Sequence, residues 1–97
     1  MKPFRWSPEK SEWLKLERGV SFESMVVAIE SGGLLDIVAH PNKVKYPHQR
    51  ILVVALDGYA YLLPFVEEDD YFFLKTILPS RKATREYLTP GEPHAKA

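Results

Sequence analysis

Residues 72–88 read FFLKTILPSRKATREYL, and they decide the fold because an apolar strand leads there directly into a short basic helix. The alternation of the strand predicts which side chains share a face of the sheet. It assigns Phe72, Leu74 and Leu78 to one face and Phe73, Lys75 and Ile77 to the other. We therefore expect the face that carries Leu74 to lie in the core.

Three cations follow that strand, namely Arg81, Lys82 and Arg85. In one interpretation the strand holds them rigidly at the rim of the sheet, where they can grip a phosphodiester or an acidic partner. In the other they form the solvated face of a C-terminal helix, which is the commoner outcome for short charge runs. The residues alone leave both interpretations open.

Composition places the function on the surface of one small fold. The chain has 97 residues, no cysteine, and thirteen acidic residues against thirteen basic ones, so its net charge is zero. That length predicts one domain. Strongly basic composition is the usual sign of a nucleic-acid-binding domain, and a net charge of zero does not provide it. The charge is locally uneven, because residues 67–70 are EEDD whereas Lys75 to Arg85 carries four positive charges and no negative one.

Two helices are predicted before any strand. Ser7 followed by proline predicts a helix start, and Gly19 predicts the end of a helix over residues 8–18. Ser21 predicts a second helix start, and that helix ends at Gly32-Gly33. The second helix carries Phe22, Met25, Val26 and Ile29 on one face.

Strands follow over residues 34–39, 51–56 and 59–66, before the strand that starts at Phe72. Asp57-Gly58 predicts a tight hairpin, and Pro64 predicts a bulge or a point where pairing stops. The predicted class is α+β, with two helices, a four-stranded and mainly antiparallel sheet, and a short C-terminal helix. The predicted order is α-α-β-β-β-β-α.

The two ends of the chain carry further expectations. The N-terminus MKPFRWSPEK lacks the apolar centre of a signal peptide, and no segment has the length of a membrane helix. A cytoplasmic protein without membrane contact is the expectation. Residues 1–88 are expected to form a single domain, and residues 89–97 a flexible tail rich in proline.

The chemistry that these residues suggest is RNA cleavage in which the substrate supplies its own 2′-hydroxyl as nucleophile. Arg50, Arg81 and Arg85 are predicted to stabilise the charge on the phosphorus oxygens. His48 is predicted as general acid or base, although a loop histidine without a role is an equally good interpretation. The predicted RNA-binding cations are Lys45, Lys75 and Lys82.

Metal chemistry is not predicted. His40, His48 and Asp36 lie near one another in the sequence, but their spacing is not that of a zinc site. The expectation is an endoribonuclease that uses neither a metal nor a cofactor.

Three pieces of the chain resemble the BrnT-type toxins of bacterial type II toxin–antitoxin systems. They are FRWSPEKSEWLKLERGVSFE at 4–23, RILVVALDGYAYLLPF at 50–65 and SRKATREYL at 80–88. The most specific parts are the tryptophan-led helix that ends in GVSFE and the segment SRKATR. Arg81, Lys82 and Arg85 match the closing basic motif of that family, and Arg50 opens the central strand where its members often carry a basic residue.

This resemblance implies a RelE-like ribonuclease fold and the arrest of translation by RNA cleavage. It also implies a ribbon-helix-helix antitoxin as partner, which neutralises the toxin and supplies any contact with DNA. The alternative is a non-catalytic co-regulator, in which the same basic rim binds an antitoxin-like, DNA-binding partner.

Overall fold

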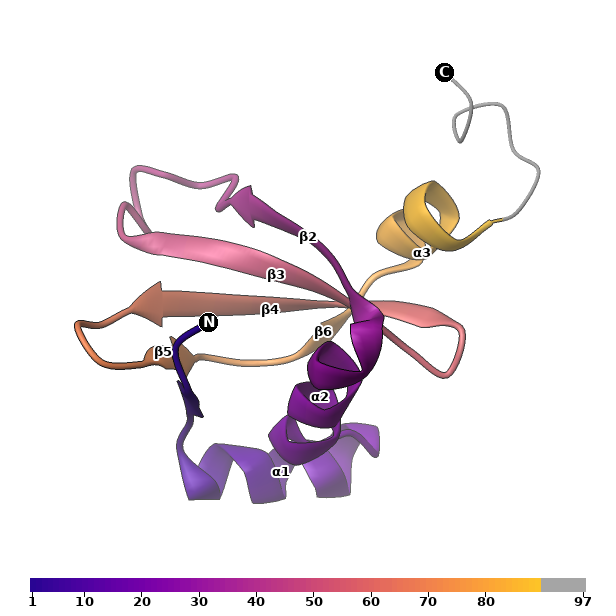
Figure 1. The fold of residues 1–97 in the computed structure, drawn as a ribbon, viewed down its shortest axis with the longest axis horizontal. Coiled ribbons are helices and arrows are strands. Elements are labelled where there is room, and N and C mark those ends of the chain that lie inside the picture. The colour runs from indigo at the N-terminus through magenta and orange to yellow at the C-terminus, as the bar shows by residue number, and fades with distance from the viewer. Residues whose placement is uncertain (90–97) are drawn as a thin grey trace.

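The computed structural model describes residues 1–89 and shows an α+β fold built on one mixed six-stranded sheet (Figure 1). The order across the sheet is β1 (Phe4–Arg5), β5 (Phe72–Leu74), β4 (Tyr59–Glu67), β3 (Gln49–Leu56) and β2 (Leu34–Ala39). The short strand β6 (Leu78–Pro79) also pairs with β4. The pairing of β1 with β5 is parallel, and the other pairings are antiparallel.

Helices cover both faces of the sheet. On one face lie α1 (Pro8–Arg18), α2 (Phe22–Ala28) and the π-helical turn η1 (Ile29–Gly33). Their apolar side chains pack with the β3, β4 and β5 residues that point the same way, including Leu52, Leu63 and Leu74. On the other face, α3 (Arg81–Leu88) packs through Ala83 against Val53 and Ala60. The sheet therefore separates a large core under α1 and α2 from a small one under α3.

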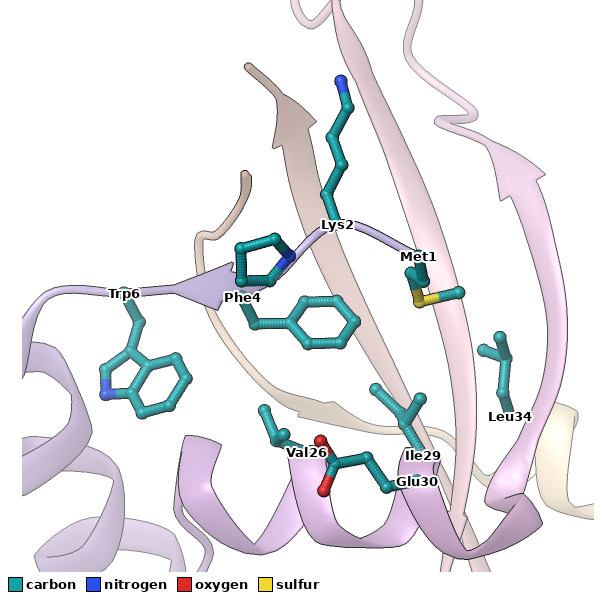
Figure 2. Close-up of a pocket in the computed structure, with 9 residues that line it drawn as sticks. Met1, Lys2, Phe4, Trp6, Val26, Ile29, Glu30 and Leu34 are labelled. Atoms are coloured by element: carbon teal, nitrogen blue, oxygen red, sulfur yellow. The ribbon is translucent and has the colours of Figure 1, made fainter. Parts of the chain in front are cut away.

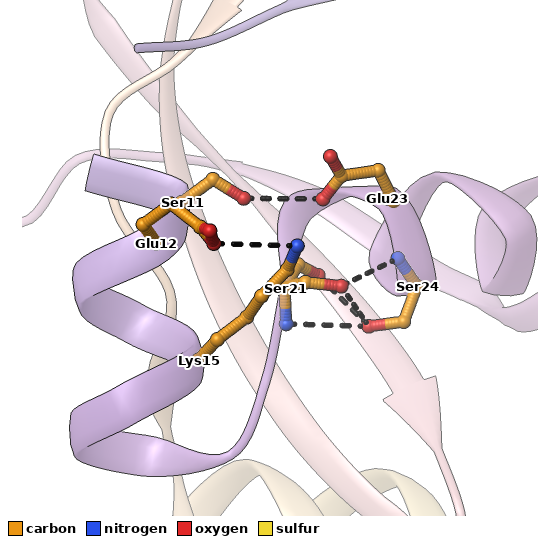
Figure 3. A network of polar contacts seen from close by, with 6 residues as sticks. All are labelled: Ser11, Glu12, Lys15, Ser21, Glu23 and Ser24. Carbon is orange, nitrogen blue, oxygen red and sulfur yellow. Dashed lines mark hydrogen bonds and ion pairs between the residues drawn. The ribbon is translucent and has the colours of Figure 1, made fainter. Parts of the chain in front are cut away.

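The predicted starts of the two N-terminal helices are confirmed, and so is the end of the first. The second is α-helical only to Ala28 and continues as the π-helical turn η1 to Gly33, in which Gly32 has a positive φ of 94°. The Ser7 hydroxyl accepts a hydrogen bond from the Lys10 N–H, and Gly19 has a positive φ of 69° at the end of α1. Ser21 and Ser24 cap the start of α2 reciprocally, and Ser11 on α1 donates to Glu23 on α2 at 3.1 Å (Figure 3). The bond from Ser11 to Glu23 joins the two helices, and Leu14 of α1 is buried in the same core cluster as Phe22 and Met25 of α2.

The central hairpin is also confirmed. Asp57 and Gly58 both have positive φ, 52° and 76°, as a two-residue hairpin turn of this hand requires. The register between β3 and β4 runs without a shift from Gln49↔Val66 to Leu56↔Tyr59. Pro64 is therefore not at a bulge of this pair, but it lies where the pairing of β4 with its other neighbours is interrupted, between β5 and β6.

The predicted element order is wrong in two places. A strand, β1, precedes the helices. It is only two residues long, which is too short to show the alternation of apolar and polar residues that predicts a strand. The predicted strand over residues 72–78 is divided into β5 and β6. The order is therefore β-α-α-β-β-β-β-β-α, with six strands in place of four.

The division of that strand has a clear physical cause. Phe65 pairs with Leu74 and Leu62 pairs with Leu78, so the three residues 75–77 lie opposite the two residues 63–64. One extra residue reverses the alternation of the faces beyond it. Ile77 is consequently buried with Leu74, and Leu78 is exposed, contrary to the sequence prediction for both.

Within residues 1–89, no helix has the length and apolar character that a membrane span requires. The predicted tail lies outside the described residues except for Thr89.

Candidate functional site

The predicted site residues lie on both faces of the sheet. Arg50 in β3 is opposite Phe65 in β4, and residues directly opposite in an antiparallel pair share a face. Phe65 belongs to the core under α1 and α2, and the Arg50 guanidinium lies over its ring at 5.0 Å. Because α3 packs on the opposite face, the sheet separates Arg50 from Arg81 and Arg85.

Arg50 also has an acidic partner. Its Nη2 is 2.7 Å from Oε1 of Glu67, whose Oε2 is 2.8 Å from the Lys2 ammonium. The hydrogen bond from Lys2, followed by the charges of Lys2 and Arg50, holds the pKa of Glu67 below its ordinary value. The acidic EEDD segment is thus partly neutralised by cations of the same chain.

This cluster of Lys2, Glu67 and Arg50 predicts a contribution to stability that depends on pH. A lowered pKa in the folded protein means that the contribution is present above the pKa of the unfolded chain and is lost as the pH falls through the folded value. Between about pH 5 and pH 3, the melting temperature of the wild type should therefore fall more steeply than that of Glu67→Gln. Glu17→Gln, an exposed glutamate outside the cluster, is the matched control and should keep the wild-type slope. Equal slopes for all three proteins would contradict the prediction.

The helix α3 is fixed to the sheet by polar contacts as well as by Ala83. The Ala60 N–H donates to the Thr84 hydroxyl at 2.8 Å, and the Ser80 N–H donates to the Ala60 carbonyl at 3.0 Å. At the other end of the helix, the Tyr87 hydroxyl donates to Oδ2 of Asp36 on β2 at 2.7 Å. This bond, together with desolvation and the negative charge of Asp36, raises the pKa of Tyr87 to about 12.

The cations of α3 point outward from this fixed helix. Arg81 and Arg85 are one helical turn apart and exposed, and the ammonium of exposed Lys82 lies 4.0 Å from the Glu86 carboxylate. These side chains are solvated, while the backbone that carries them is held by hydrogen bonds to the sheet. Their binding of a phosphodiester or of an acidic partner stays a prediction.

A small hollow lies on the same face as α3, over the part of the sheet that the helix leaves uncovered. Its surface is mostly apolar, but five of its seven lining residues have polar side chains, and we call it the polar hollow. Its volume is about 260 Å³. It is lined by His40, Tyr46, Gln49, Pro64, Lys75, Thr76 and Leu78. The loop between β2 and β3 supplies one wall, and the bulged segment 75–77 supplies the other. Lys75, predicted to bind RNA, therefore lines the same hollow as His40, and its ammonium lies 5.3 Å from the ring of Phe73.

Backbone contacts of the loop orient His40 in this hollow. Its Nδ1 accepts a hydrogen bond from the Asn42 N–H at 3.0 Å, and its ring lies 4.6 Å from the ring of Tyr46. The Tyr46 N–H in turn donates to the Asn42 carbonyl, and the Gln49 N–H to the Tyr46 carbonyl. With Nδ1 accepting, the proton of the neutral imidazole is on Nε2, which is the ring atom left to donate to a ligand.

The other predicted residues of this loop lie outside the hollow. His48 and Lys45 are both exposed and do not line it, and the Lys45 ammonium lies 5.3 Å from the ring of Tyr46. Sequence reasoning missed His40, Tyr46 and Gln49 as a group. The sequence signal that could have indicated this group is Asn42, which follows His40-Pro41. Asparagine favours turns in which its side chain hydrogen-bonds the backbone of the same loop.

A larger and mostly apolar hollow of about 510 Å³ lies under the N-terminal segment (Figure 2). Phe4, Trp6, Val26, Ile29 and Leu34 supply its apolar lining, and the Lys2 side chain points away from them. Glu30 is its one acidic lining residue, and the rest of the lining near Glu30 is apolar. Among residues 1–89, no three His, Asp or Glu side chains gather as a metal site would need.

Comparison with protein-family models, with curated proteins and with solved structures finds no match. The candidate site therefore rests on its own geometry.

Proposed function

We propose that this protein is an RNA-cleaving toxin of BrnT type, with a RelE-like fold, and that a ribbon-helix-helix antitoxin neutralises it. The observation that carries the proposal is the polar hollow, which both His40 and Lys75 line on the sheet face that also bears α3. The resemblance of residues 4–23, 50–65 and 80–88 to that family supports the same function.

The hollow suits the attack of a 2′-hydroxyl on the adjacent phosphodiester. In this reaction the 2′-oxygen gives its proton to water and bonds to phosphorus, so that a 2′,3′-cyclic phosphate forms. The bond from phosphorus to the 5′-oxygen breaks, and the 5′-oxygen takes a proton from water. The Lys75 ammonium would stabilise the negative charge on the phosphorus oxygens, and the His40 Nε2–H would donate to one of them. Exposed Arg81 and Arg85 would bind the flanking phosphates. His48, predicted from the sequence as proton donor or acceptor, does not line the hollow and has no role in this scheme.

A second candidate is a binding module without catalysis. The specific observation in its favour is that Arg50 is paired with Glu67 and lies on the face opposite α3, so the predicted catalytic arginines do not converge. In this alternative the outward cations of α3 bind an acidic segment of the antitoxin-like partner.

Incubation of the purified protein with RNA separates the two functions. The toxin hypothesis predicts cyclic-phosphate ends that the wild type produces and that Arg81→Ala with Arg85→Ala reduces about tenfold or more, as expected for lost phosphate contacts. Expression in a bacterial host should arrest growth, and co-expression with a ribbon-helix-helix antitoxin should relieve the arrest. Soluble protein that binds such a partner but leaves both RNA and growth unchanged would favour the binding module.

A further inference from the structure

Strand β2 is a free edge of the sheet. It pairs with β3 on one side, and within residues 1–89 no strand pairs with its other side (Figure 1). Free edges are usually blunted by proline, by lysine, by a bulge or by a covering element. Strand β2 contains neither proline nor lysine, and its one register shift lies at its start, between Leu34 and Asp36. Instead, Ile37 and Val38 are 40% and 36% exposed and point to opposite faces, so both sides of the edge are apolar.

The hydrogen bonds show which backbone groups face outward. The Ile37 N–H donates to Oδ1 of the neighbouring Asp36 at 2.8 Å, so it does not point toward β3. In an antiparallel ladder the N–H and C=O of one residue point to the same side. Both backbone groups of Ile37 are therefore presented along the free edge, where an added strand would bind them.

The charges along this edge favour a second copy of the same strand. Glu30 precedes β2 in η1 and Asp36 lies within it, whereas Lys43 and Lys45 lie in the exposed loop that follows it. An antiparallel copy brings the acidic start of one strand toward the basic end of the other. Pairing centred on Ile37 also sets Asp36 opposite Val38 of the second copy, so no like charges oppose each other within the strands.

We propose that the protein forms a two-fold symmetric dimer in which β2 pairs antiparallel with β2 of a second copy, centred on Ile37. Such an interface uses the same surface on both subunits and closes on itself. In the dimer, the Ile37 N–H exchanges the Asp36 carboxylate for the Ile37 carbonyl of the other copy. The dimer does not depend on RNA cleavage, so either proposal can fail without the other.

A single cysteine tests the centre of this interface. The chain has no cysteine, so Ile37→Cys would be its sole thiol. The Cα atoms of a hydrogen-bonded antiparallel pair are about 5.5 Å apart, a distance that a disulfide spans. Mild oxidation should therefore convert most of the Ile37→Cys protein to a covalent dimer. Leu16→Cys, which replaces an exposed side chain on α1, is the control for collisional crosslinking, and equal crosslinking rates would overturn the proposal.

Sedimentation equilibrium tests the free protein. At about 100 µM the wild type should be dimeric, and Ile37→Lys should raise the dissociation constant at least about tenfold by placing two lysines opposite each other. Leu16→Lys adds the same charge away from the edge and should not change it. Glu30→Lys should weaken the dimer, and Lys43→Glu with Lys45→Glu should restore it. A wild type that is monomeric at this concentration, or equal effects of the two lysine variants, would overturn the proposal.

Discussion

Replacement of His40 by alanine is expected to lower the rate of RNA cleavage about a hundredfold or more, because the loss of one donor to a developing oxyanion has an effect of this size. The imidazole is held by the Asn42 N–H and by the Tyr46 ring, so its Nε2 is oriented before any substrate binds. Cleavage of a short RNA under single-turnover conditions measures the effect on chemistry. Thermal melting should be close to that of the wild type, because His40 belongs to neither core cluster.

Three further variants locate the reaction within the loop. Lys75→Ala should also reduce cleavage strongly, whereas Lys43→Ala, an exposed lysine that does not line the hollow, should have a small effect. His48→Ala separates the two histidines of the loop. If His48→Ala lost most of the cleavage rate while His40→Ala cleaved normally, the reaction would take place outside the hollow, and a site in the polar hollow would be contradicted.

Local signals in the sequence predicted much of the fold. Ser7, Gly19 and Ser21 act within a few residues of their own position, so their roles are visible without the tertiary structure. The same holds for Asp57-Gly58, where the turn depends on two residues with positive φ. The first helix, the start of the second and the central hairpin were therefore predicted close to their observed bounds.

Features that depend on a distant partner were not predictable in this way. Strand β1 exists because Phe4 and Arg5 pair with Phe72 and Phe73, far along the chain. The ion pair of Arg50 with Glu67 depends on the register of β3 and β4, which places the two side chains near each other at the sheet end. A basic residue at the start of a strand carries no sign of such a partner.

The candidate site shows the same limit. The polar hollow forms where the loop after β2 meets the bulged segment 75–77, and neither part is close to the other in sequence. Residues 72–78 alternate like a regular strand, so the sequence pattern gives no indication of the extra residue in that segment. The extra residue changes the direction of the chain at Lys75, and the site and the core therefore depend on the same irregularity.

This irregularity predicts a pattern of stability changes that a regular strand would not give. Leu74→Ala and Ile77→Ala should each reduce the free energy of unfolding by about 2 to 5 kcal/mol, because both side chains are fully buried in the core under α1 and α2. Leu78→Ala should have a much smaller effect, since the Leu78 side chain is 39% exposed on the other face. Chemical denaturation with urea measures the three changes on one scale.

The comparison between Ile77→Ala and Leu78→Ala tests whether segment 75–77 is bulged, because Leu74 is buried with or without the bulge. In a regular strand, Leu78 would share the face of Leu74 and Ile77 would point away from it. A larger loss for Leu78→Ala than for Ile77→Ala would therefore exclude the bulge. It would also remove the segment that brings Lys75 into the lining of the hollow that His40 shares, so this stability measurement is at the same time a test of the polar hollow.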